Sequence, residues 1–515
     1  MRNNLGLFLT KRCQLGPRRE ALVEVERGRR FSYAELEARS NRTANALRGL
    51  GVGPGDRVAI LMMNSAEFVE SYFAIAKLGA IMVPLNWRLT PDELEFILGD
   101  AGALLLLFGS EFDDCAAELQ RRALPVKLWV RAKSREAGPG PGPSQDYDEL
   151  TAAASDSLPE IGAEGDDDLF IMYTSGTTGL PKGVVHSHDT VIAASTTILM
   201  TADMRHNDRY LALLPLFHVG ALTPLINCVH RGCATVILRA FDPSLIFPTI
   251  ERERITTGLA VPAMLRFMLA AGNHEAHDHS MLRWLMSGAA PVPVPLIEQF
   301  AALGIEIHQV YGLTESCGPA CLISPEEAIA KAGSTGPAFF HTEVRVVNDA
   351  GADVAEGEIG EVIVRAPHVM KGYWNRPDDT AETIRNGWLH TGDMASLDAE
   401  GFVYIQDRKK DMIISGGENV YPAEIENLLS GHPDVADVAA IGLPSEKWGE
   451  SPAVIVVPRP GAKLDGDALL DYCQGKLARF KQPKQVEFVE EIPRNPTGKI
   501  LKRLLRERFP GPAPE

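Results

Sequence analysis

The stretch Tyr173-Thr174-Ser175-Gly176-Thr177-Thr178-Gly179-Leu180-Pro181-Lys182-Gly183 lies between two short apolar runs. Its glycines let backbone N–H groups approach an anion, its hydroxyl side chains add donors, and Lys182 adds a positive charge. A Walker loop needs Gly-Lys followed by Ser or Thr at the start of a helix, whereas Lys182 precedes Gly183 and a predicted strand. The residues from Ser175 to Leu180 alone would be equally typical of an exposed turn. The whole stretch predicts a phosphate-binding loop that is not a Walker loop.

The chain as a whole is long and acidic. Its 515 residues exceed the usual size of one hydrophobic core, so two or more domains are expected. The net charge of -17 argues against a nucleic-acid-binding protein, which needs clustered Lys and Arg. The seven cysteines are an odd number, and Cys317 with Cys321 lacks a second pair for zinc, so we expect reduced thiols and a cytoplasmic location.

Neither a signal peptide nor a transmembrane helix is expected. The apolar stretch Leu5 to Leu9 lacks a cleavage site of small residues after it, and it is expected to begin a helix. The longest apolar region, Leu211 to Ile226, contains two prolines and falls short of the about 20 residues that span a bilayer.

Strand-like and helix-like segments alternate along the first part of the chain, which predicts an α/β fold with a largely parallel sheet. We expect helices near 32–50, 66–78 and 189–200, and strands near 58–62, 81–84 and 103–108. Residues 134–168 include Gly138-Pro139-Gly140-Pro141-Gly142-Pro143 and are expected to form an exposed excursion. The charge-dense stretch 407–411 predicts a domain boundary, and the pattern that follows, including a helix over 468–480, predicts a small α+β domain.

Four further motifs carry groups that suit nucleotide chemistry. They are Ser287-Gly288-Ala289-Ala290-Pro291, Gln309-Val310-Tyr311-Gly312-Leu313-Thr314-Glu315, Leu389-His390-Thr391-Gly392-Asp393 and Pro493-Arg494-Asn495-Pro496-Thr497-Gly498-Lys499. Each one alone has an ordinary explanation, as a Gly/Pro turn, a solvated loop carboxylate, a Thr-Gly-Asp turn or a solvated terminal lysine. Together with the loop at 173–183, and in this order, they resemble the motifs of the adenylate-forming superfamily, which includes acyl-CoA synthetases, peptide-synthetase adenylation domains and firefly luciferase. The resemblance covers essentially the whole chain.

The resemblance implies an architecture and a nucleotide site. Residues 1–407 would form the N-terminal domain that binds AMP and the acyl group, 408–410 a hinge at Lys410, and 411–515 a mobile C-terminal domain. The catalytic residues implied are Lys499, Glu315, Thr174 and His218. The residues implied to bind ATP or AMP are Thr174, Ser175, Gly176, Thr177, Thr178, Gly179, Lys182, Gly288, Ala289, Ala290, Gln309, Tyr311, Gly312, Thr314, Asp393, Arg408 and Lys499.

Physical chemistry suits these implied roles. Glu315 would bind Mg²⁺, which prefers hard oxygen ligands and is usually held by one or two carboxylates together with substrate phosphates. Lys499, a mobile point charge with three donors, would bridge the substrate carboxylate and the α-phosphate as charge develops. The carboxylate of Asp393 would accept both ribose hydroxyls, with Arg408 sharing that task.

The resemblance also implies sites for the acid and for coenzyme A. The acid pocket would be lined by His218, Val219, Gly220, Val261, Pro262, Gly288 and Gly312. A histidine in an apolar run such as Pro215 to Leu222 is more often a buried core residue. The resemblance instead implies that His218 lies in the acid pocket. The residues that would face CoA are Gly416, Gly417, Glu418, Lys447 and Trp448, where paired glycines allow a close backbone approach.

Within the superfamily, the sequence is most similar to mycobacterial-type very-long-chain fatty acyl-CoA synthetases, with related bacterial feruloyl-CoA and 4-coumarate-CoA ligases. The implied activity is ATP-dependent, AMP-forming ligation of a fatty acid to CoA, with Mg²⁺ as cofactor. Three alternatives stay open: an aromatic acid as substrate, a separate carrier protein as acceptor, and a non-catalytic nucleotide-binding protein. The arginine-rich lid of those relatives corresponds here to Met204 to Arg209, which has only two arginines, so membrane association is at most peripheral. A homodimer also stays open.

Overall fold

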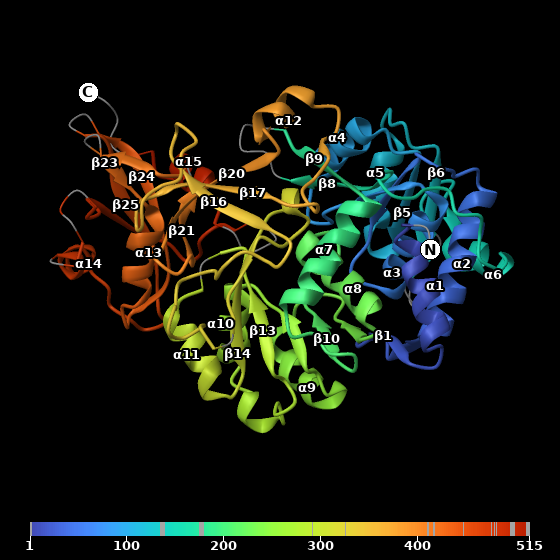
Figure 1. Ribbon diagram of the computed structural model, residues 1–515, viewed down its shortest axis with the longest axis horizontal. Helices are drawn as coiled ribbons and strands as arrows, with labels where there is room; N and C mark the ends of the chain where they lie inside the picture. Colours follow the sequence, from blue (N-terminus) through green and yellow to red (C-terminus); the bar gives the residue numbers. More distant parts are fainter. Residues whose placement is uncertain are drawn as a thin grey trace.

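The computed structural model describes residues 3–133, 138, 140–174, 180–290, 292–324, 326–408, 411–415, 418–445, 448–474, 476–477, 479, 481–494 and 500–510. The chain forms four sheets, two large and two small, and the strands of the two large sheets are interleaved along the sequence. Figure 1 shows the chain running from the large sheets to a small C-terminal body that carries β22 to β26. Among the described residues, no helix is long and apolar enough to cross a bilayer.

The first large sheet is parallel except at its two edges. Its strands, in spatial order, are β15 (Cys321–Leu322), β14 (Glu306–Tyr311), β13 (Trp284–Ser287), β12 (Thr257–Leu259), β10 (Arg209–Ala212), β11 (Ala234–Ile237), β1 (Glu20–Glu24) and β2 (Arg29–Ser32). Only β15 and β2 pair antiparallel with their neighbours. The carboxyl ends of β13 and β14 therefore meet at one edge of this sheet, and the motifs at 287–291 and 309–315 begin there.

The second large sheet contains the strands that flank the phosphate-loop motif. Its order is β18 (Gly372–Tyr373), β9 (Lys182–Ser187), β8 (Asp168–Thr174), β4 (Ile81–Pro84), β3 (Arg57–Leu61), β5 (Leu105–Gly109), β6 (Leu128–Ala132) and β7 (Gln145–Asp146). The strands from β8 to β7 are parallel, whereas β8, β9 and β18 pair antiparallel. The expected α/β fold with largely parallel sheet is confirmed.

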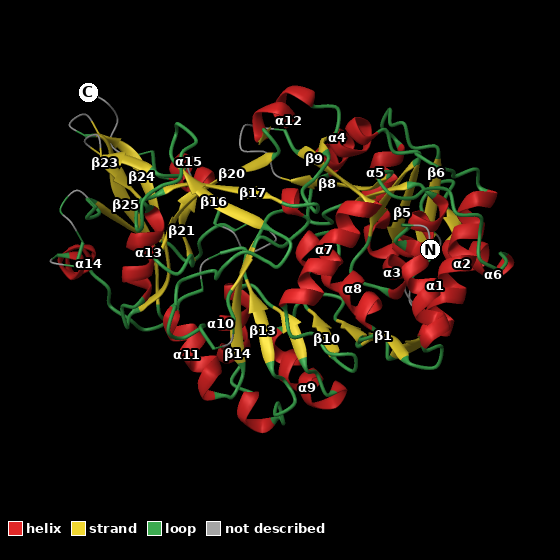
Figure 2. Ribbon diagram, viewed as in Figure 1, coloured by secondary structure: helices red, strands yellow, loops and turns green. Residues whose placement is uncertain are grey.

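Helices fill the space between the two large sheets and cover their outer faces (Figure 2). They are α1 (Gly6–Leu15), α2 (Tyr33–Gly49), α3 (Ala66–Leu78), α4 (Pro91–Ala101), α5 (Asp113–Gln120), α6 (Tyr147–Ala153), α7 (His188–Thr201), α8 (Val219–Arg231), α9 (Pro243–Glu253), α10 (Pro262–Ala270) and α11 (Val294–Ala302), with 3₁₀ turns η1 (Ser110–Phe112) and η2 (His274–Ala276). Every residue of α3 is buried. The largest core cluster joins α3 and α8 to strands of both sheets, so these helices form a shared central layer.

Local sequence signals set several of these helices. Ser32 accepts from the N–H of Glu35 while the Glu35 carboxylate accepts from the N–H of Ser32, which is the capping box that starts α2. Thr90 and Glu93 do the same for α4, with Pro91 in the first turn. The expected helix at 66–78 and the expected strand at 81–84 are reproduced at both ends.

Two expectations about secondary structure are wrong in part. Residues 134–168 are not only an exposed excursion, because they contribute β7 and α6. Tyr147 starts α6 and is buried, with its hydroxyl 2.7 Å from that of Thr43 and 3.0 Å from the Glu70 carboxylate. A single buried anchor leaves no periodic pattern to detect. The helix expected over 468–480 is α14 (Gly466–Cys473), which ends earlier.

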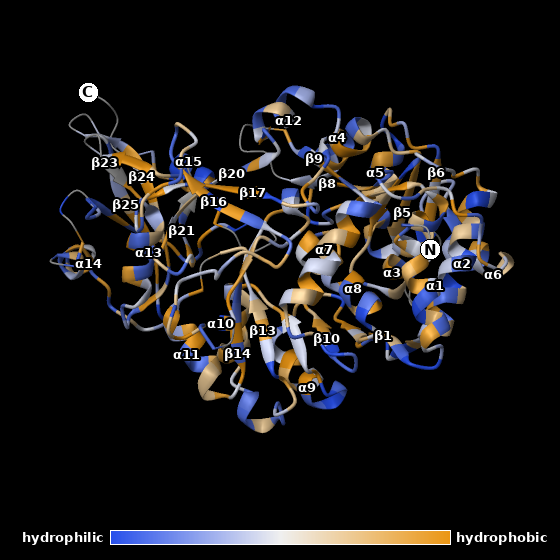
Figure 3. Ribbon diagram, viewed as in Figure 1, coloured by the Kyte–Doolittle hydropathy of each residue, from blue (hydrophilic) through white to orange (hydrophobic). Residues whose placement is uncertain are grey.

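The two small sheets complete the chain. One contains β16 (Glu343–Val347), β17 (Gly360–Arg365), β20 (Trp388–Leu397), β19 (Ile384–Arg385) and β21 (Val403–Arg408), with α12 (Pro377–Thr383) beside it. The other contains β23 (Glu418–Val420), β22 (Ile413–Ser415), β25 (Gly449–Pro458), β24 (Val435–Ser445) and β26 (Gln485–Phe488), with α13 (Pro422–Ser430), α14 and α15 (Lys502–Arg508). Figure 3 shows β17 and β24 as largely apolar ribbons, as expected for strands that support a core on each side of 407–411.

Candidate functional site

The phosphate-loop motif connects β8 to β9. Thr174 ends β8 and lies directly opposite Lys182, the first residue of β9, and the Thr174 hydroxyl donates to the Lys182 carbonyl at 3.5 Å. Ser175, Gly176, Thr177, Thr178 and Gly179 lie outside the described residues. The strand expected after the motif is present as β9. The motif is therefore followed by a strand, whereas a Walker loop is followed by a helix.

The Lys182 ammonium faces an acidic and aromatic cluster. It pairs with the carboxylate of Asp379 in α12, and this pairing lowers the pKa of Asp379 below its ordinary value. It also lies 5.2 Å from the centre of the Tyr373 ring. The Tyr373 hydroxyl in turn donates to Oε1 of Glu315 at 2.8 Å. Tyr373 thus links the cation of the phosphate loop to the carboxylate of the motif at 309–315.

Glu315 sits in a short 3₁₀ turn, η3 (Thr314–Ser316), directly after β14. Its side chain is partly exposed. Its backbone carbonyl accepts from the N–H of Met370 at 2.8 Å. Two buried histidines hold the flanking carbonyls: His186 contacts that of Thr314 and His368 that of Ser316, each at 2.8 Å. Burial lowers the pKa of both imidazoles to about 4, so both rings are neutral near pH 7.

The ends of β13 and β14 form a wall of small residues. Ser287 and Gln309 lie opposite each other, and the Ser287 hydroxyl and the Gln309 amide nitrogen are buried without a hydrogen-bond partner in the described part of the chain. A Cβ on Gly288 would lie 2.4 Å from the carbonyl oxygen of Val310, so only glycine fits. Ala289 has φ of 69°, which is rare for a residue with a side chain. The wall is therefore closely packed, with no room for a side chain at position 288.

Tyr311 joins this wall to the third sheet. It is 8 % exposed, and its hydroxyl donates to Oδ2 of Asp393 in β20 at 2.7 Å. Asp393 pairs through its backbone with Arg408 at the end of β21. The side chain of Arg408 lies outside the described residues. Tyr311 and Asp393, for which the resemblance implies contacts with adenine and with ribose, are therefore in direct contact.

The predicted acid pocket borders the start of α8. His218 precedes this helix, and Val219 and Gly220 form its first turn. Gly318, which follows the Glu315 turn, faces Val219 and Thr223. A Cβ on Gly312 would lie 1.4 Å from the carbonyl oxygen of Gly318, so these two backbones are in contact. Val261 and Pro262 are buried at the start of α10.

His218 is the polar side chain among the residues assigned to this pocket. Its ring lies 4.3 Å from that of Phe217, and its Nε2 atom is buried with no partner among the residues described. Burial, and secondarily the nearby charge of Arg88, lower the pKa of His218 to about 3. The imidazole is therefore neutral near pH 7, with one nitrogen that can donate a hydrogen bond and one that can accept.

The structure describes only part of the C-terminal motifs. Lys410, Gly416, Gly417, Lys447 and Lys499 lie outside the described residues, as does the side chain of Glu418. Trp448 is 46 % exposed at the start of the β25 hairpin. Arg494 donates to the Asp437 carboxylate at 2.8 and 2.9 Å, and Asp437 lies 3.8 Å from the Arg266 guanidinium of α10. The pair between Arg494 and Asp437 therefore holds the segment before Lys499 close to Arg266 of α10.

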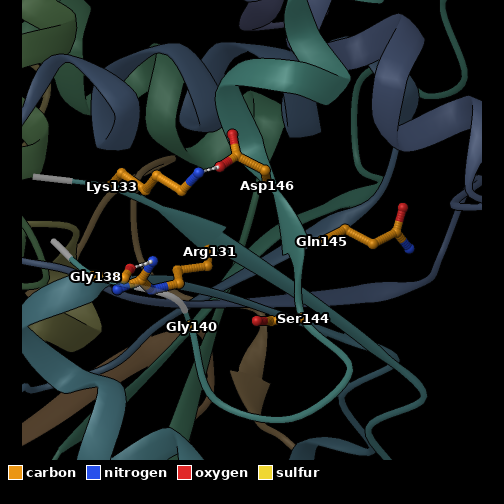
Figure 4. Close-up of a pocket in the computed structure, with 7 residues that line it drawn as sticks. All are labelled: Arg131, Lys133, Gly138, Gly140, Ser144, Gln145 and Asp146. Atoms are coloured by element: carbon orange, nitrogen blue, oxygen red, sulfur yellow. Dashed lines mark hydrogen bonds and ion pairs between the residues drawn. The ribbon is translucent and has the colours of Figure 1, made fainter.

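Two cavities lie outside this cluster or at its margin. One, of about 460 Å³, lies at the β6–β7 edge, where Lys133 pairs with Asp146 and Arg131 donates to the Gly138 carbonyl (Figure 4). The other, of about 570 Å³, is lined by Lys371, Tyr373 and Trp374 and borders the Lys182 cluster. Neither carries the chemistry that the motifs predict.

Sequence reasoning missed four residues of the site: Tyr373, Asp379, His186 and His368. They come from segments between the motifs or beside them. No spacing rule connects a histidine at 186 with one at 368, and only the fold brings both onto one turn.

Comparisons with known proteins identify the family of the chain. The family described as AMP-binding enzyme matches residues 9–374, and the AMP-binding enzyme C-terminal domain matches residues 424–499. A long-chain-fatty-acid–CoA ligase of Mycobacterium tuberculosis is 45% identical over 515 residues, which is 99% of this chain and 100% of the relative. A feruloyl-CoA synthase of Amycolatopsis is 40% identical over 511 residues, 99% of this chain and 100% of the relative. The structure of o-succinylbenzoate CoA synthetase from Bacillus subtilis with its acyl-adenylate intermediate has a TM-score of 0.86 and 35% identity, covering 98% of each chain.

Proposed function

The chain belongs to the AMP-binding enzyme family, and from this premise we propose that it converts a fatty acid to an acyl adenylate and then to an acyl-CoA. It is an acid–thiol ligase of the AMP-forming kind. One observation carries the residue-level proposal: printed contacts connect three separate motifs. Lys182 lies over the Tyr373 ring, and the Tyr373 hydroxyl donates to Glu315. Tyr311, in the same motif as Glu315, donates from its hydroxyl to Asp393.

The reaction divides into two displacements. In the first, a carboxylate oxygen of the acid attacks the α-phosphorus of ATP, a P–O bond forms, and pyrophosphate leaves. In the second, the CoA sulfur attacks the acyl carbon, the bond from that carbon to the bridging oxygen breaks, and AMP leaves with that oxygen. The thiol proton is lost to solvent or base. Adenylation thus replaces hydroxide, a poor leaving group, with AMP.

We assign the first displacement to residues of both domains. Thr174, the loop 175–179 and Lys182 hold the triphosphate, with Thr314 on a phosphate oxygen. Gly288, Ala289, Ala290, Gln309, Tyr311 and Gly312 hold adenine. Asp393 and Arg408 hold ribose, and Lys499 bridges the acid and the α-phosphate. The close approach of Gly288 to the Val310 carbonyl supports the adenine assignment, as does the Gln309 amide nitrogen, which has no hydrogen-bond partner in the described part of the chain.

Glu315 fits a magnesium ion that is shared with phosphate. One carboxylate with substrate oxygens is the usual set for Mg²⁺. In the described part of the chain, no three or more His, Cys, Asp or Glu side chains gather as a metal site. When bound, Mg²⁺ would neutralise charge on the triphosphate.

The acid pocket supports an apolar substrate. Its proposed lining is small or aliphatic and consists of Val219, Gly220, Val261, Pro262 and Gly312. His218, whose imidazole is neutral, lies directly before the first residue of α8. The alternative is a flat aromatic acid, which the same small residues would admit and which the similarity to a feruloyl-CoA synthase favours.

Domain motion connects the two steps. We propose that residues 1–407 and 411–515 move about 408–410, so that Lys499 serves the first step and Gly416, Gly417, Glu418, Lys447 and Trp448 face CoA in the second. The separate core of the small C-terminal sheet supports independent movement. All seven cysteines are free thiols, which suits the proposed cytoplasmic location.

A panel of acids tests the substrate. AMP formation with ATP and CoA would be measured for acids from acetate to very-long-chain fatty acids, and for benzoate, coumarate and ferulate, with the Lys499→Ala protein as background. We expect the highest kcat/KM for long alkyl chains. A higher value for ferulate or coumarate would replace the fatty acid with an aromatic acid. No AMP above background with any acid would contradict the ligase.

Tyr311→Phe should weaken ATP binding without disturbing the fold. The ring stays available to adenine, but the Asp393 carboxylate loses a donor worth about 1.5 kcal/mol, so we expect the KM for ATP to rise about tenfold. Tyr404→Phe is the matched control, because its hydroxyl contacts Asp398 at 3.4 Å in the same sheet away from the site. Equal KM values in all three proteins would contradict the placement of ribose at Asp393.

A further inference from the structure

Three consecutive backbone carbonyls around Glu315 are each held by a different donor from elsewhere in the chain. The carbonyl of Thr314 accepts from Nε2 of His186, that of Glu315 from the N–H of Met370, and that of Ser316 from Nδ1 of His368. All three distances are 2.8 Å. Within the turn, the Thr314 carbonyl also accepts from the N–H of Cys317 at 3.0 Å. The donors from His186, Met370 and His368 come from other segments of the chain, so these tertiary contacts set the orientation of the turn.

The two histidines are built to donate in fixed directions. Both are fully buried, at 0 % exposure. A carbonyl oxygen only accepts, so the nitrogen that faces it must carry the proton. The second nitrogen of His186 lies 3.2 Å from the Thr190 hydroxyl, and that of His368 lies 2.8 Å from the Thr342 hydroxyl. Each ring is therefore held on both sides and cannot turn away from the Glu315 turn.

The carboxylate of Glu315 is also fixed. The Tyr373 hydroxyl donates to Oε1 at 2.8 Å, and the Tyr373 N–H donates to the Thr380 hydroxyl at 2.9 Å. In the described part of the chain, Oε2 has no hydrogen-bond partner and stays available. His186 and Lys182 share the short strand β9, two pleats apart on one face, so the same strand aligns the phosphate loop and the turn.

We propose that His186 and His368 are positioning residues that hold the Glu315 carboxylate at the geometry Mg²⁺ requires, with Tyr373 orienting its Oε1. The proposal rests on the proposed function, in which Glu315 binds the metal. Magnesium demands near-ideal octahedral geometry, so a displaced carboxylate weakens its binding. Groups that orient a metal ligand typically contribute 10- to 100-fold to affinity.

The test pairs each loss of a donor with a replacement that keeps it. His186→Leu and His368→Leu remove the donors. His186→Gln places an amide N–H near the former Nε2, and His368→Asn places one near the former Nδ1. Tyr373→Phe removes one oxygen and leaves no cavity, so it tests the same carboxylate should a leucine variant fold poorly.

Two measurements would be made on the full-length proteins. The first is the Mg²⁺ concentration for half-maximal pyrophosphate release. We expect it to rise about 10- to 100-fold in the leucine and phenylalanine variants, and to return toward wild type in the amide variants. Thioester formation from supplied acyl adenylate should not change. The second is hydrogen exchange of the Ser316, Cys317 and Gly318 amides without ligands, which should accelerate in the leucine variants only.

His188→Leu is the matched control. His188 is equally buried and two residues from His186, but its Nδ1 accepts from the N–H of Leu5, away from the turn. We expect lower stability with an unchanged Mg²⁺ requirement. An equal rise in the Mg²⁺ requirement, or no recovery with Gln and Asn, would overturn the proposal.

The exchange measurement separates this proposal from the proposed function. If wild type releases no pyrophosphate with any acid, the proposed function fails. Unchanged exchange in the leucine variants would then overturn the positioning of the turn as well, whereas faster exchange restored by Gln and Asn would support it.

Discussion

Replacing Lys499 with alanine is expected to lower pyrophosphate release from ATP and acid by about 10²- to 10³-fold. The side chain is assigned to the charge that develops between the acid and the α-phosphorus, and no other residue is proposed to replace it. The segment that carries it is anchored just before it, where Arg494 pairs with Asp437 beside Arg266. Conversion of supplied acyl adenylate to acyl-CoA should remain near the wild-type rate, because Lys499 is assigned only to the first step.

Measuring the two half-reactions separately checks this prediction. Lys463→Ala, an exposed lysine of the same C-terminal region, should leave both rates unchanged. Equal loss of both half-reactions in Lys499→Ala would contradict the assignment of the lysine to adenylation.

Gly312→Ala is expected to slow adenylation strongly and to destabilise the protein. A Cβ at this position would lie 1.4 Å from the Gly318 carbonyl oxygen and 2.6 Å from the carbonyl carbon, so the backbone must move. The displaced segment carries Glu315 and follows Tyr311. We expect at least a 100-fold loss of kcat/KM, since misplacement by about 1 Å can cost that much, and a loss of unfolding free energy of about 1–3 kcal/mol.

Gly99→Ala is the matched control for the glycine substitution. Gly99 lies in α4, is exposed, and has nothing within 4 Å of the position of a Cβ. Alanine there should leave activity unchanged and stabilise the helix slightly. Chemical denaturation and kcat/KM for both variants would check the prediction. Full activity of Gly312→Ala would contradict the close contact between residues 312 and 318.

Much of the fold follows from local sequence signals. The Ser32–Glu35 capping box starts α2, and the apolar run at 66–78 forms α3, which is buried along its whole length against α1, α2 and β4. Weak signals were missed, such as Tyr147, whose hydroxyl connects α6 to Thr43 of α2 and Glu70 of α3. A helix is detected by its periodic face, and α6 is too short to show one.

The site residues also fall into two groups, those that a sequence motif indicates and those that only the fold brings together. Glu315 and Asp393 could be assigned from the sequence because each lies in a contiguous motif that resembles a motif of the family, and their roles stay predictions. Tyr373 and the histidines at 186 and 368 could not, because their roles depend on contacts between residues far apart in the chain. Their hydrogen bonds to a single turn exist only after three segments have packed.

Oxygen transfer from the acid tests the central claim most directly. Fatty acid labelled with oxygen-18 in its carboxylate would be incubated with ATP, Mg²⁺ and CoA, and the products analysed by mass spectrometry. The acyl-adenylate route predicts AMP that carries one labelled oxygen in its phosphate, and pyrophosphate without label. Label in inorganic phosphate, with ADP as the nucleotide product, would show that the acid is activated at the γ-phosphorus and would contradict the account.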